Sequence, residues 1–229
     1  MSANPQTSPD LARTKVLACA TVIEEMQPLM PPEVNYEVFD FGLHLVPTDL
    51  KTALQTAIDE AGKAYDIVIL GYGLCSMAVV GLEARNCTLV VPKVDDCIAI
   101  FLGSSDSYQV QHEKEPGTYY LTKGWIEVSD TLLDEYKRTV ERYGETRADW
   151  IMQQMLKNYK RLVYIDTGVQ NQDGYRQHAQ KTAQQFNLNY EEVRGSNALI
   201  KKMIFGPWDD EFVVVAPGQS IQYTDFKIS

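Results

Sequence analysis

The chain has 229 residues, of which 45% are hydrophobic and 23% are charged, so it is long enough to bury a substantial core. Its formal net charge of −10 at pH 7 argues against a general binder of nucleic acids or anionic membranes, because phosphates attract a basic surface. The N-terminal segment is polar, and no apolar run approaches the roughly 20 residues of a membrane-spanning helix. We therefore expect a cytoplasmic protein, whose four cysteines are thiols, metal ligands or redox groups rather than structural disulfides.

Short apolar runs alternate with helical patterns along the first part of the chain. Residues up to about Thr14 are predicted to be a disordered lead-in. Strands are predicted at 15–20, 34–41, 66–70 and 88–92, and helices at 24–30, at 48–62 with Thr48 as N-cap, and at 97–102. This alternation is the signature of an α/β sheet, and near-continuous apolar strands indicate a parallel sheet buried on both faces.

The middle of the chain departs from this alternation. Aromatic-rich segments at 116–121 and 124–126 are predicted as a strand or extended loop, and a long helix follows at about 130–159. Alternation then resumes, with strands at 161–165, 189–193 and 212–216 and helices at 175–186 and 196–204. We predict a single α/β domain over residues 15–229, a Rossmann-like three-layer sandwich with a mostly parallel sheet and a helical insertion at about 130–159.

Four candidate metal ligands lie where predicted strands end. Cys19 closes the first strand, His44 follows the second, Cys75 follows the third and Cys97 follows the fourth. In a parallel sheet the carboxyl ends of the strands converge on one crevice, and thiolates with an imidazole suit a metal ion or an iron–sulfur cluster. We therefore predict that these four residues bind a metal ion or an iron–sulfur cluster, with iron favoured over zinc.

Each candidate also has a structural interpretation. Cys19 on its own would be an ordinary core cysteine, and a lone histidine such as His44 is more often a hydrogen-bonded structural residue than a ligand. Glu25 follows Cys19 closely enough to contact the same crevice. Cys87 begins its strand at the opposite edge from the other cysteines, so it is left out of the site.

The segment Gly71-Tyr72-Gly73-Leu74-Cys75 is the sharpest local signal. Two glycines just after a buried strand permit close approach of the backbone to a ligand, so Gly71 and Gly73 are predicted to bind the cofactor. The segment is not a dinucleotide fingerprint, because Ser76 stands where the third glycine would fall. A tight strand-to-helix turn with a buried thiol is the alternative interpretation.

Two aspartates complete the predicted site. Asp95 and Asp96 precede Cys97 and are predicted to cap its helix, whose N-terminal dipole lowers the pKa of a thiol. The two carboxylates oppose a bare thiolate, so they favour a bound cation. Asp166, after the strand at 161–165, is placed with Asp96 among the cofactor-binding residues. A helix cap beside an inert core cysteine is the alternative.

Several motifs together resemble a known family. They are GYGLC at 71–75, LVVPKVDDC at 89–97, FLGS at 101–104, PGTYYLTKGW at 116–125 and YIDTG at 164–168. In this combination the chain, from about Lys15 onward, resembles the bacterial and archaeal family called domain of unknown function 1638. Many relatives have a histidine where this chain has Asp95, so the resemblance implies that Asp95 replaces that histidine here.

The resemblance implies no established reaction. Such proteins are often encoded near corrinoid-dependent methyltransferases, which implies a place in corrinoid-linked one-carbon metabolism. Besides a metal or iron–sulfur protein, two other functions stay open. One is a metal-free thiol enzyme with Cys75 or Cys97 as nucleophile, and the other is a non-catalytic accessory module that binds a corrinoid, a small molecule or a corrinoid-protein partner. The sequence does not fix the oligomeric state.

Overall fold

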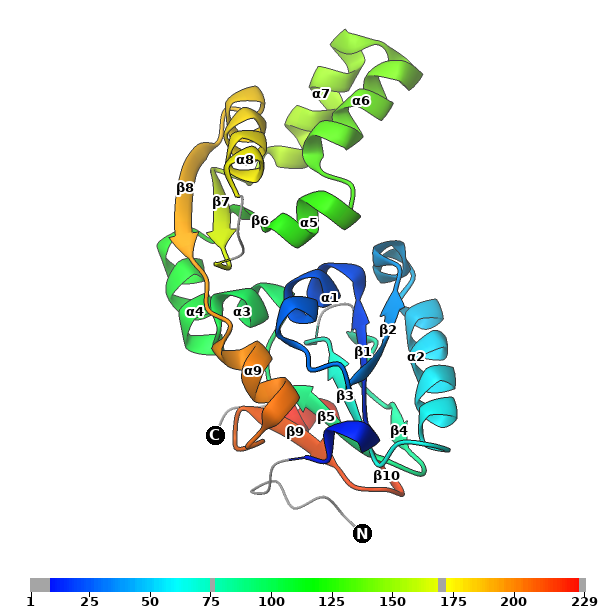
Figure 1. Cartoon of the computed structure of the whole chain (residues 1–229). Coiled ribbons are helices and arrows are strands. Elements are labelled where there is room, and N and C mark those ends of the chain that lie inside the picture. The colour runs from blue at the N-terminus through cyan, green and yellow to red at the C-terminus, as the bar shows by residue number, and fades with distance from the viewer. Residues whose placement is uncertain (1–8, 75–76, 169–171, 227–229) are drawn as a thin grey trace.

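The computed structural model describes residues 9–74, 77–168 and 172–226, which are built around a five-stranded sheet (Figure 1). The strands lie in the order β2-β1-β3-β5-β9. Their bounds are β1 Thr14–Cys19, β2 Asn35–Phe39, β3 Ile67–Gly71, β5 Thr88–Pro92 and β9 Phe212–Val215. The strands pair in parallel, except that β9 runs antiparallel to β5. The predicted fold class is confirmed: the protein is a mixed α/β structure with a mostly parallel central sheet, consistent with a Rossmann-like three-layer sandwich.

Helices cover both faces of this sheet. Strands β3 and β5 are buried along their whole length, as expected of strands covered on both sides. Helix α1 (Ala20–Met26) follows β1, and helix α2 (Pro47–Ala61) follows β2. The connections through α1 and α2 run in opposite directions along the sheet, so right-handed crossovers place the two helices on opposite faces. The apolar side of α2 packs inward through Leu50, Leu54, Ala57 and Ile58.

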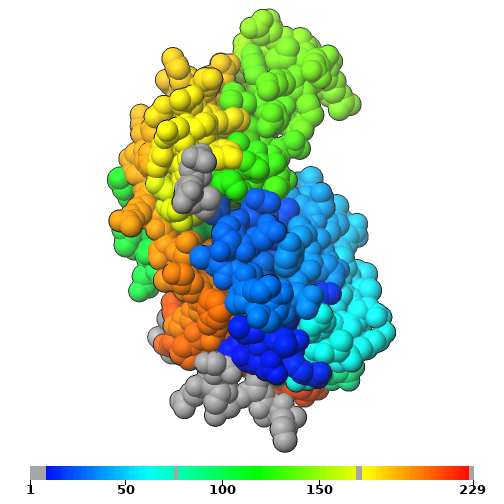
Figure 2. Space-filling view, viewed as in Figure 1, coloured from blue at the N-terminus to red at the C-terminus, as the bar shows by residue number. Residues whose placement is uncertain are grey.

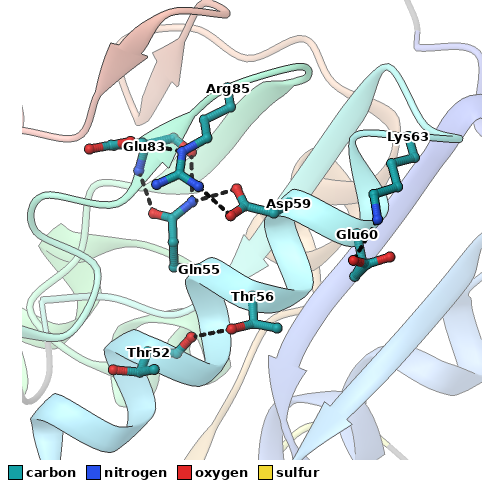
Figure 3. A network of polar contacts seen from close by, with 8 residues as sticks. All are labelled: Thr52, Gln55, Thr56, Asp59, Glu60, Lys63, Glu83 and Arg85. Carbon is teal, nitrogen blue, oxygen red and sulfur yellow. Dashed lines mark hydrogen bonds and ion pairs between the residues drawn. The ribbon is translucent and has the colours of Figure 1, made fainter.

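Polar contacts tie the outer side of α2 to the short strand β4 (Glu83–Ala84), which pairs with β10 (Gln219–Ser220) (Figure 3). The Glu83 amide donates to the Gln55 side chain at 2.8 Å, and Arg85 binds Asp59 at 2.5 Å. An exposed ion pair contributes only about 0–1 kcal/mol. The network therefore mainly fixes the path of the chain between β3 and β5.

A second parallel sheet lies above the first in Figure 1. Its strands, in the order β6-β7-β8, are β6 Thr118–Leu121, β7 Arg161–Asp166 and β8 Asn189–Arg194. The helices of the same region are α5 Lys123–Val128, α6 Leu132–Tyr143, α7 Glu145–Leu156 and α8 Asp173–Gln185. The strand pattern predicts β7 and β8, but it does not show that they form a sheet of their own. No helix in the described part of the chain is long and apolar enough to cross a lipid bilayer.

Several details differ from the sequence-based expectations. The helix predicted at 24–30 lies earlier, as α1 at Ala20–Met26. The long helix predicted at about 130–159 is broken into α6 and α7 at Gly144, whose φ of +78° lies in the left-handed region that favours glycine. The segment 124–126, predicted as extended, belongs to α5, where the Thr122 hydroxyl accepts the Trp125 amide at 3.1 Å. Residues 11–13, within the predicted lead-in, form a 3₁₀ turn.

The two predicted helix caps have different outcomes. Thr48 lies inside the first turn of α2, which begins at Pro47, a residue whose fixed φ suits that position. Asp96 caps α3 (Cys97–Leu102) as predicted, because its Oδ1 accepts the Ile98 amide at 2.9 Å. The same helix ends at Gly103, as predicted, with a φ of +92°.

The chain crosses between the two sheets at two adjacent points. It leaves the first sheet through α3 and α4 (Ser105–Lys114), and it returns through α9 (Ala198–Phe205). The Ser196 amide donates to the Phe101 carbonyl at 3.0 Å, and a Cβ on Gly103 would lie 2.5 Å from the Cβ of Ser196. The outgoing and returning segments are therefore in direct contact.

The carboxyl ends of the two sheets face each other (Figure 1). Helix α1, which starts at the carboxyl end of β1, packs against α5, which follows the carboxyl end of β6. In the space-filling view of Figure 2, the blue surface of α1 adjoins the green and yellow surface of the second sheet's region. Val163 and Ile165 of β7 belong to the same buried core as the first sheet. The segments that follow the strands of both sheets therefore lie between the sheets.

Candidate site at the facing sheet edges

The predicted ligands follow four neighbouring strands at one edge of the five-stranded sheet. His44 follows β2, Cys19 closes β1 and Cys97 follows β5. Cys75 follows β3 in the sequence and lies outside the described residues. Among the described residues, the strand order β2-β1-β3-β5 places His44, Cys19 and Cys97 along this edge in that order, with β3 between β1 and β5. Cys87 precedes β5, at the opposite edge, as predicted.

The spacing of the strands makes Cys75 the decisive position. Within residues 9–74, 77–168 and 172–226, no three His, Cys, Asp or Glu side chains gather closely enough to bind a metal ion. Neighbouring strands lie about 4.8 Å apart, so β1 and β5, which flank β3, are about 10 Å apart; Cys19 closes β1, and Cys97 begins α3, which follows β5. A site with three thiolates at this edge therefore requires Cys75, which follows the strand between them.

Cys19 is buried at the start of α1. Its side chain is 2% exposed, and its Sγ lies 3.0 Å from the Thr21 hydroxyl. Burial raises the pKa of the Cys19 thiol, whereas the Thr21 hydroxyl and the backbone amides at the start of α1 act in the opposite direction. A thiol of raised pKa keeps its proton at neutral pH unless a metal ion displaces it.

The ring of His44 lies in an aromatic cluster that joins the two sheets. It stacks on Phe41 at 5.3 Å between ring centroids and lies 5.7 Å from Tyr72, while Phe41 contacts Trp125 of α5 at 5.6 Å. His44 Nδ1 lies 3.1 Å from the Phe41 carbonyl oxygen. Because a carbonyl only accepts hydrogen bonds, Nδ1 carries the proton, and the neutral ring presents Nε2 with a lone pair. Metal-binding histidines are typically held in this way.

The burial of this ring leads to a pH-dependent prediction. Burial lowers the pKa of His44 below its ordinary value of 6.5. The unfolded chain therefore binds the proton first, so the stability contributed by neutral His44 is complete above about pH 6.5 and is lost as the pH falls below that value. We expect the free energy of unfolding to decrease less between about pH 7 and pH 5 in His44→Gln than in the wild type, as measured by urea titration.

His112→Gln is the matched control, because it removes an exposed histidine from α4. His178 contributes its own pH dependence of stability in every variant, since burial lowers its pKa as well. The comparison therefore rests on the difference between each variant and the wild type. A wild-type pH dependence in His44→Gln would contradict the prediction.

Gly71, the last residue of β3, and Gly73, just after it, are in close contact with the protein itself. A Cβ on Gly71 would lie 2.4 Å from the Cβ of Ala18 on β1, and a Cβ on Gly73 would lie 2.6 Å from the Val94 carbonyl oxygen. The Leu74 amide donates to that same oxygen at 2.9 Å. The glycines thus allow β1, β3 and the chain after β5 to pack tightly. Their binding of a cofactor stays a prediction.

Asp96 is engaged by protein groups next to Cys97. Besides capping α3, its carboxylate interacts with Tyr108 of α4. Burial raises the pKa of Asp96, and burial together with Asp96 raises the pKa of Tyr108. Cys97 itself is partly exposed, in contrast to the buried Cys19 and Cys87. A carboxyl and a phenol beside an accessible thiol are groups that can exchange protons with a substrate.

Asp166 lies at the corresponding edge of the second sheet. Its Oδ2 binds Arg176 Nη2 of α8 at 2.6 Å, and its Oδ1 accepts the Gly168 amide at 2.9 Å. Arg176 also binds Glu192 of β8 at 2.8 Å. Asp166 therefore belongs to an ion-pair network around a cleft of its own sheet, and the described contacts do not bring it to Cys19 or Cys97.

Glu25 connects the facing edges, and the sequence does not reveal its partners. The side chain lies on α1 and is 3% exposed. Its Oε1 accepts the Gly124 amide of α5 at 3.1 Å, and its Oε2 accepts the Thr167 hydroxyl after β7 at 2.6 Å. The available signal was the spacing, since Glu25 follows the buried Val22 by three positions on the inner face of α1.

Comparison with known proteins identifies a matching family, for which no activity is known. A family model described as "Protein of unknown function (DUF1638)" matches residues 38–204. No curated protein and no solved structure matches the chain. The matched range includes His44, Cys75, Cys97 and the whole second sheet, whereas Cys19 precedes it. Because the match covers more than half of the sequence, the chain belongs to this family of unknown function, DUF1638.

Proposed function

We propose that the protein binds a metal ion or an iron–sulfur cluster at the carboxyl edge of its five-stranded sheet, with Cys19, Cys75 and Cys97 as thiolate ligands and His44 as the fourth. The observation that supports the proposal is the strand order, because in the sequence each of these residues closes or follows one of four neighbouring strands. The chain also reverses its winding direction between β1 and β3, and such switch points are where open α/β sheets bind ligands.

The spacing along the edge favours a cluster over a single ion. Two thiolates on one zinc ion lie at most about 4.6 Å apart, since each Zn–S bond is about 2.3 Å. Cys19 closes β1 and Cys97 begins the helix that follows β5, and these two strands are separated by about twice the strand spacing. A cluster of several iron atoms spaces its thiolates more widely than one ion does. We therefore propose an iron–sulfur cluster rather than a zinc ion, with three irons or coordination positions held by the cysteines and the remaining one by His44.

The proposed setting is the reducing cytoplasm, where these thiols stay available. Our proposal of a role in corrinoid-linked methyl transfer, with a corrinoid protein or a small molecule as partner, rests on the resemblance to the family. In such a pathway a three-cysteine cluster would supply electrons or activate a substrate. An unchanged visible spectrum when cobalamin is added to the purified protein would count against direct corrinoid binding.

Metal analysis after anaerobic purification tests the site. We expect bound iron and sulfide, with visible absorption that is lost in Cys19→Ala, Cys75→Ala and Cys97→Ala, because a cluster held by three thiolates does not survive the loss of one. Cys87→Ala is the matched control: it also removes a buried cysteine, but from the opposite edge, so its cluster should remain.

Each other outcome is informative. Zinc without sulfide, lost in the same three variants, would keep the site and exclude the cluster. A metal-free protein would overturn the proposal. If Cys97 in such a protein reacted with iodoacetamide faster than an ordinary exposed cysteine, the second candidate function would replace the first. That candidate, a metal-free thiol enzyme, is favoured by the partial exposure of Cys97 beside Asp96 and Tyr108.

A further inference from the structure

A cleft of about 840 Å³ lies where the second sheet meets α9. Asp166 and Arg194, the last residues of β7 and β8, border it together with Thr167, which follows β7. Ser196, which precedes α9, and Lys201, near the start of α9, border it as well. The cleft is therefore at the carboxyl edge of a parallel sheet, the edge at which α/β proteins bind small ligands. It is large enough for a metabolite of modest size.

In this cleft the acidic side chains have partners of opposite charge, whereas two basic side chains do not. Its two carboxylates, Asp166 and Glu192, are both bound by Arg176. Arg194 and Lys201 form no ion pair and no side-chain hydrogen bond with any part of the chain that the structure describes. Both side chains are exposed, and two positive charges without an acidic partner therefore border the same cleft. An anionic ligand would neutralise them.

The pairing register of β7 and β8 places Arg194 beside Asp166, whose carboxylate is already bound by Arg176. Asp166 on β7 pairs directly with Arg194 on β8, and Glu192 lies two positions before Arg194 on the same side of that strand. Because Arg176 already binds both carboxylates, neither one needs Arg194 as a partner. The guanidinium of Arg194 is thus left with its hydrogen-bond donors available to a ligand.

Two neutral side chains add donors at the same place. The Ser196 hydroxyl accepts the Ala198 amide at 3.2 Å, which leaves its own proton to be donated elsewhere. The side chain of Asn197 makes no capping bond to α9. Guanidinium, ammonium, hydroxyl and amide donors around one cleft are the groups that bind the oxygens of a phosphate or a carboxylate.

We infer that this cleft binds a small molecule through a phosphate or carboxylate group, with Arg194 and Lys201 as cationic partners and Ser196 and Asn197 as neutral donors. The site uses the edge of the second sheet and none of the proposed metal ligands. The inferred anion binding is therefore a function separate from metal binding, and an experiment can contradict either proposal without affecting the other.

Isothermal titration calorimetry with inorganic phosphate and with succinate tests this site on the full chain as purified. We expect saturable binding of one of the two probes, and the preferred probe identifies the ligand's anionic group. Arg194→Gln should weaken that binding about tenfold or more, because hydrogen bonds between charged groups are among the strongest in proteins. Lys201→Gln should weaken it in the same direction.

Lys157→Gln is the matched control, since it removes one positive charge from an exposed position at the end of α7. It should bind the preferred probe as the wild type does. Binding weakened equally in Lys157→Gln and Arg194→Gln would mean that only overall charge matters, and the inference would be wrong. It would also be wrong if neither probe bound saturably at millimolar concentration. Metal content, measured on the same preparations, reports separately on the proposed metal site.

Discussion

Replacing Glu25 by alanine should lower the free energy of unfolding by roughly 2–6 kcal/mol, because it leaves two buried donors without an acceptor. These donors are the Gly124 amide and the Thr167 hydroxyl, which the carboxylate binds at 3.1 Å and 2.6 Å. The glutamate is 3% exposed, so water does not readily replace it. Urea unfolding of Glu25→Ala and the wild type measures the difference.

Glu24→Ala is the matched control, because it removes the neighbouring carboxylate from the same helix. Glu24 lies 3.6 Å from Lys123, and both side chains are partly exposed, so its loss should cost only about 0–1 kcal/mol. Glu25→Gln keeps one acceptor oxygen and should fall between the two alanine variants. If Glu25→Ala and Glu24→Ala were equally stable, the carboxylate would not be the connection between the sheets that its contacts suggest.

The second large effect is expected at Gly71, where alanine should destabilise the protein by about 1–3 kcal/mol through overpacking. A Cβ there would lie 2.4 Å from the Cβ of Ala18 and 3.2 Å from Cγ1 of Val22. Gly71 and Ala18 pair across β3 and β1 in the centre of the sheet, so neither backbone can move without disturbing other strands. Thermal or urea unfolding measures the loss.

Two variants make this result specific. Ala18→Gly combined with Gly71→Ala removes the closest contact and should recover part of the lost stability. Gly174→Ala lies on α8, where no neighbouring atom of the described residues comes within 4 Å of the new Cβ, so it should be neutral or stabilising by up to about 1 kcal/mol. A Gly71→Ala protein as stable as the wild type would show that the sheet yields at this position.

Local features of the fold could be predicted from the sequence because their causes are local. Asp96 caps α3 and Gly103 ends it, and both residues act within one turn of the helix that they bound. The same holds for the buried strand β3, whose apolar run marks it without reference to any partner. Gly144 was the exception. It interrupts a helical pattern that continues on both sides, and an isolated glycine is tolerated in many helices.

Pairing between distant segments could not be predicted in the same way. The apolar pattern of β7 suits either sheet, and only its neighbours β6 and β8 assign it to the second one. For the candidate site, the principle that strand ends converge placed His44, Cys19 and Cys97 at one edge, as observed. The principle gives no distances, however. It also gave no indication of the partners of Glu25, which come from segments about 100 and 140 residues away.

The contact between the outgoing and returning segments has a consequence for the order of folding. The edge strand β9 pairs with β5, although Val215 and Leu89 are separated by most of the chain. Closing so long a loop costs entropy that grows with its length. Once residues between α3 and α9 have folded, the Phe101 carbonyl and the Ser196 amide lie 3.0 Å apart, and the effective loop becomes short. The second sheet is therefore expected to form first, and β9 to dock onto β5 late.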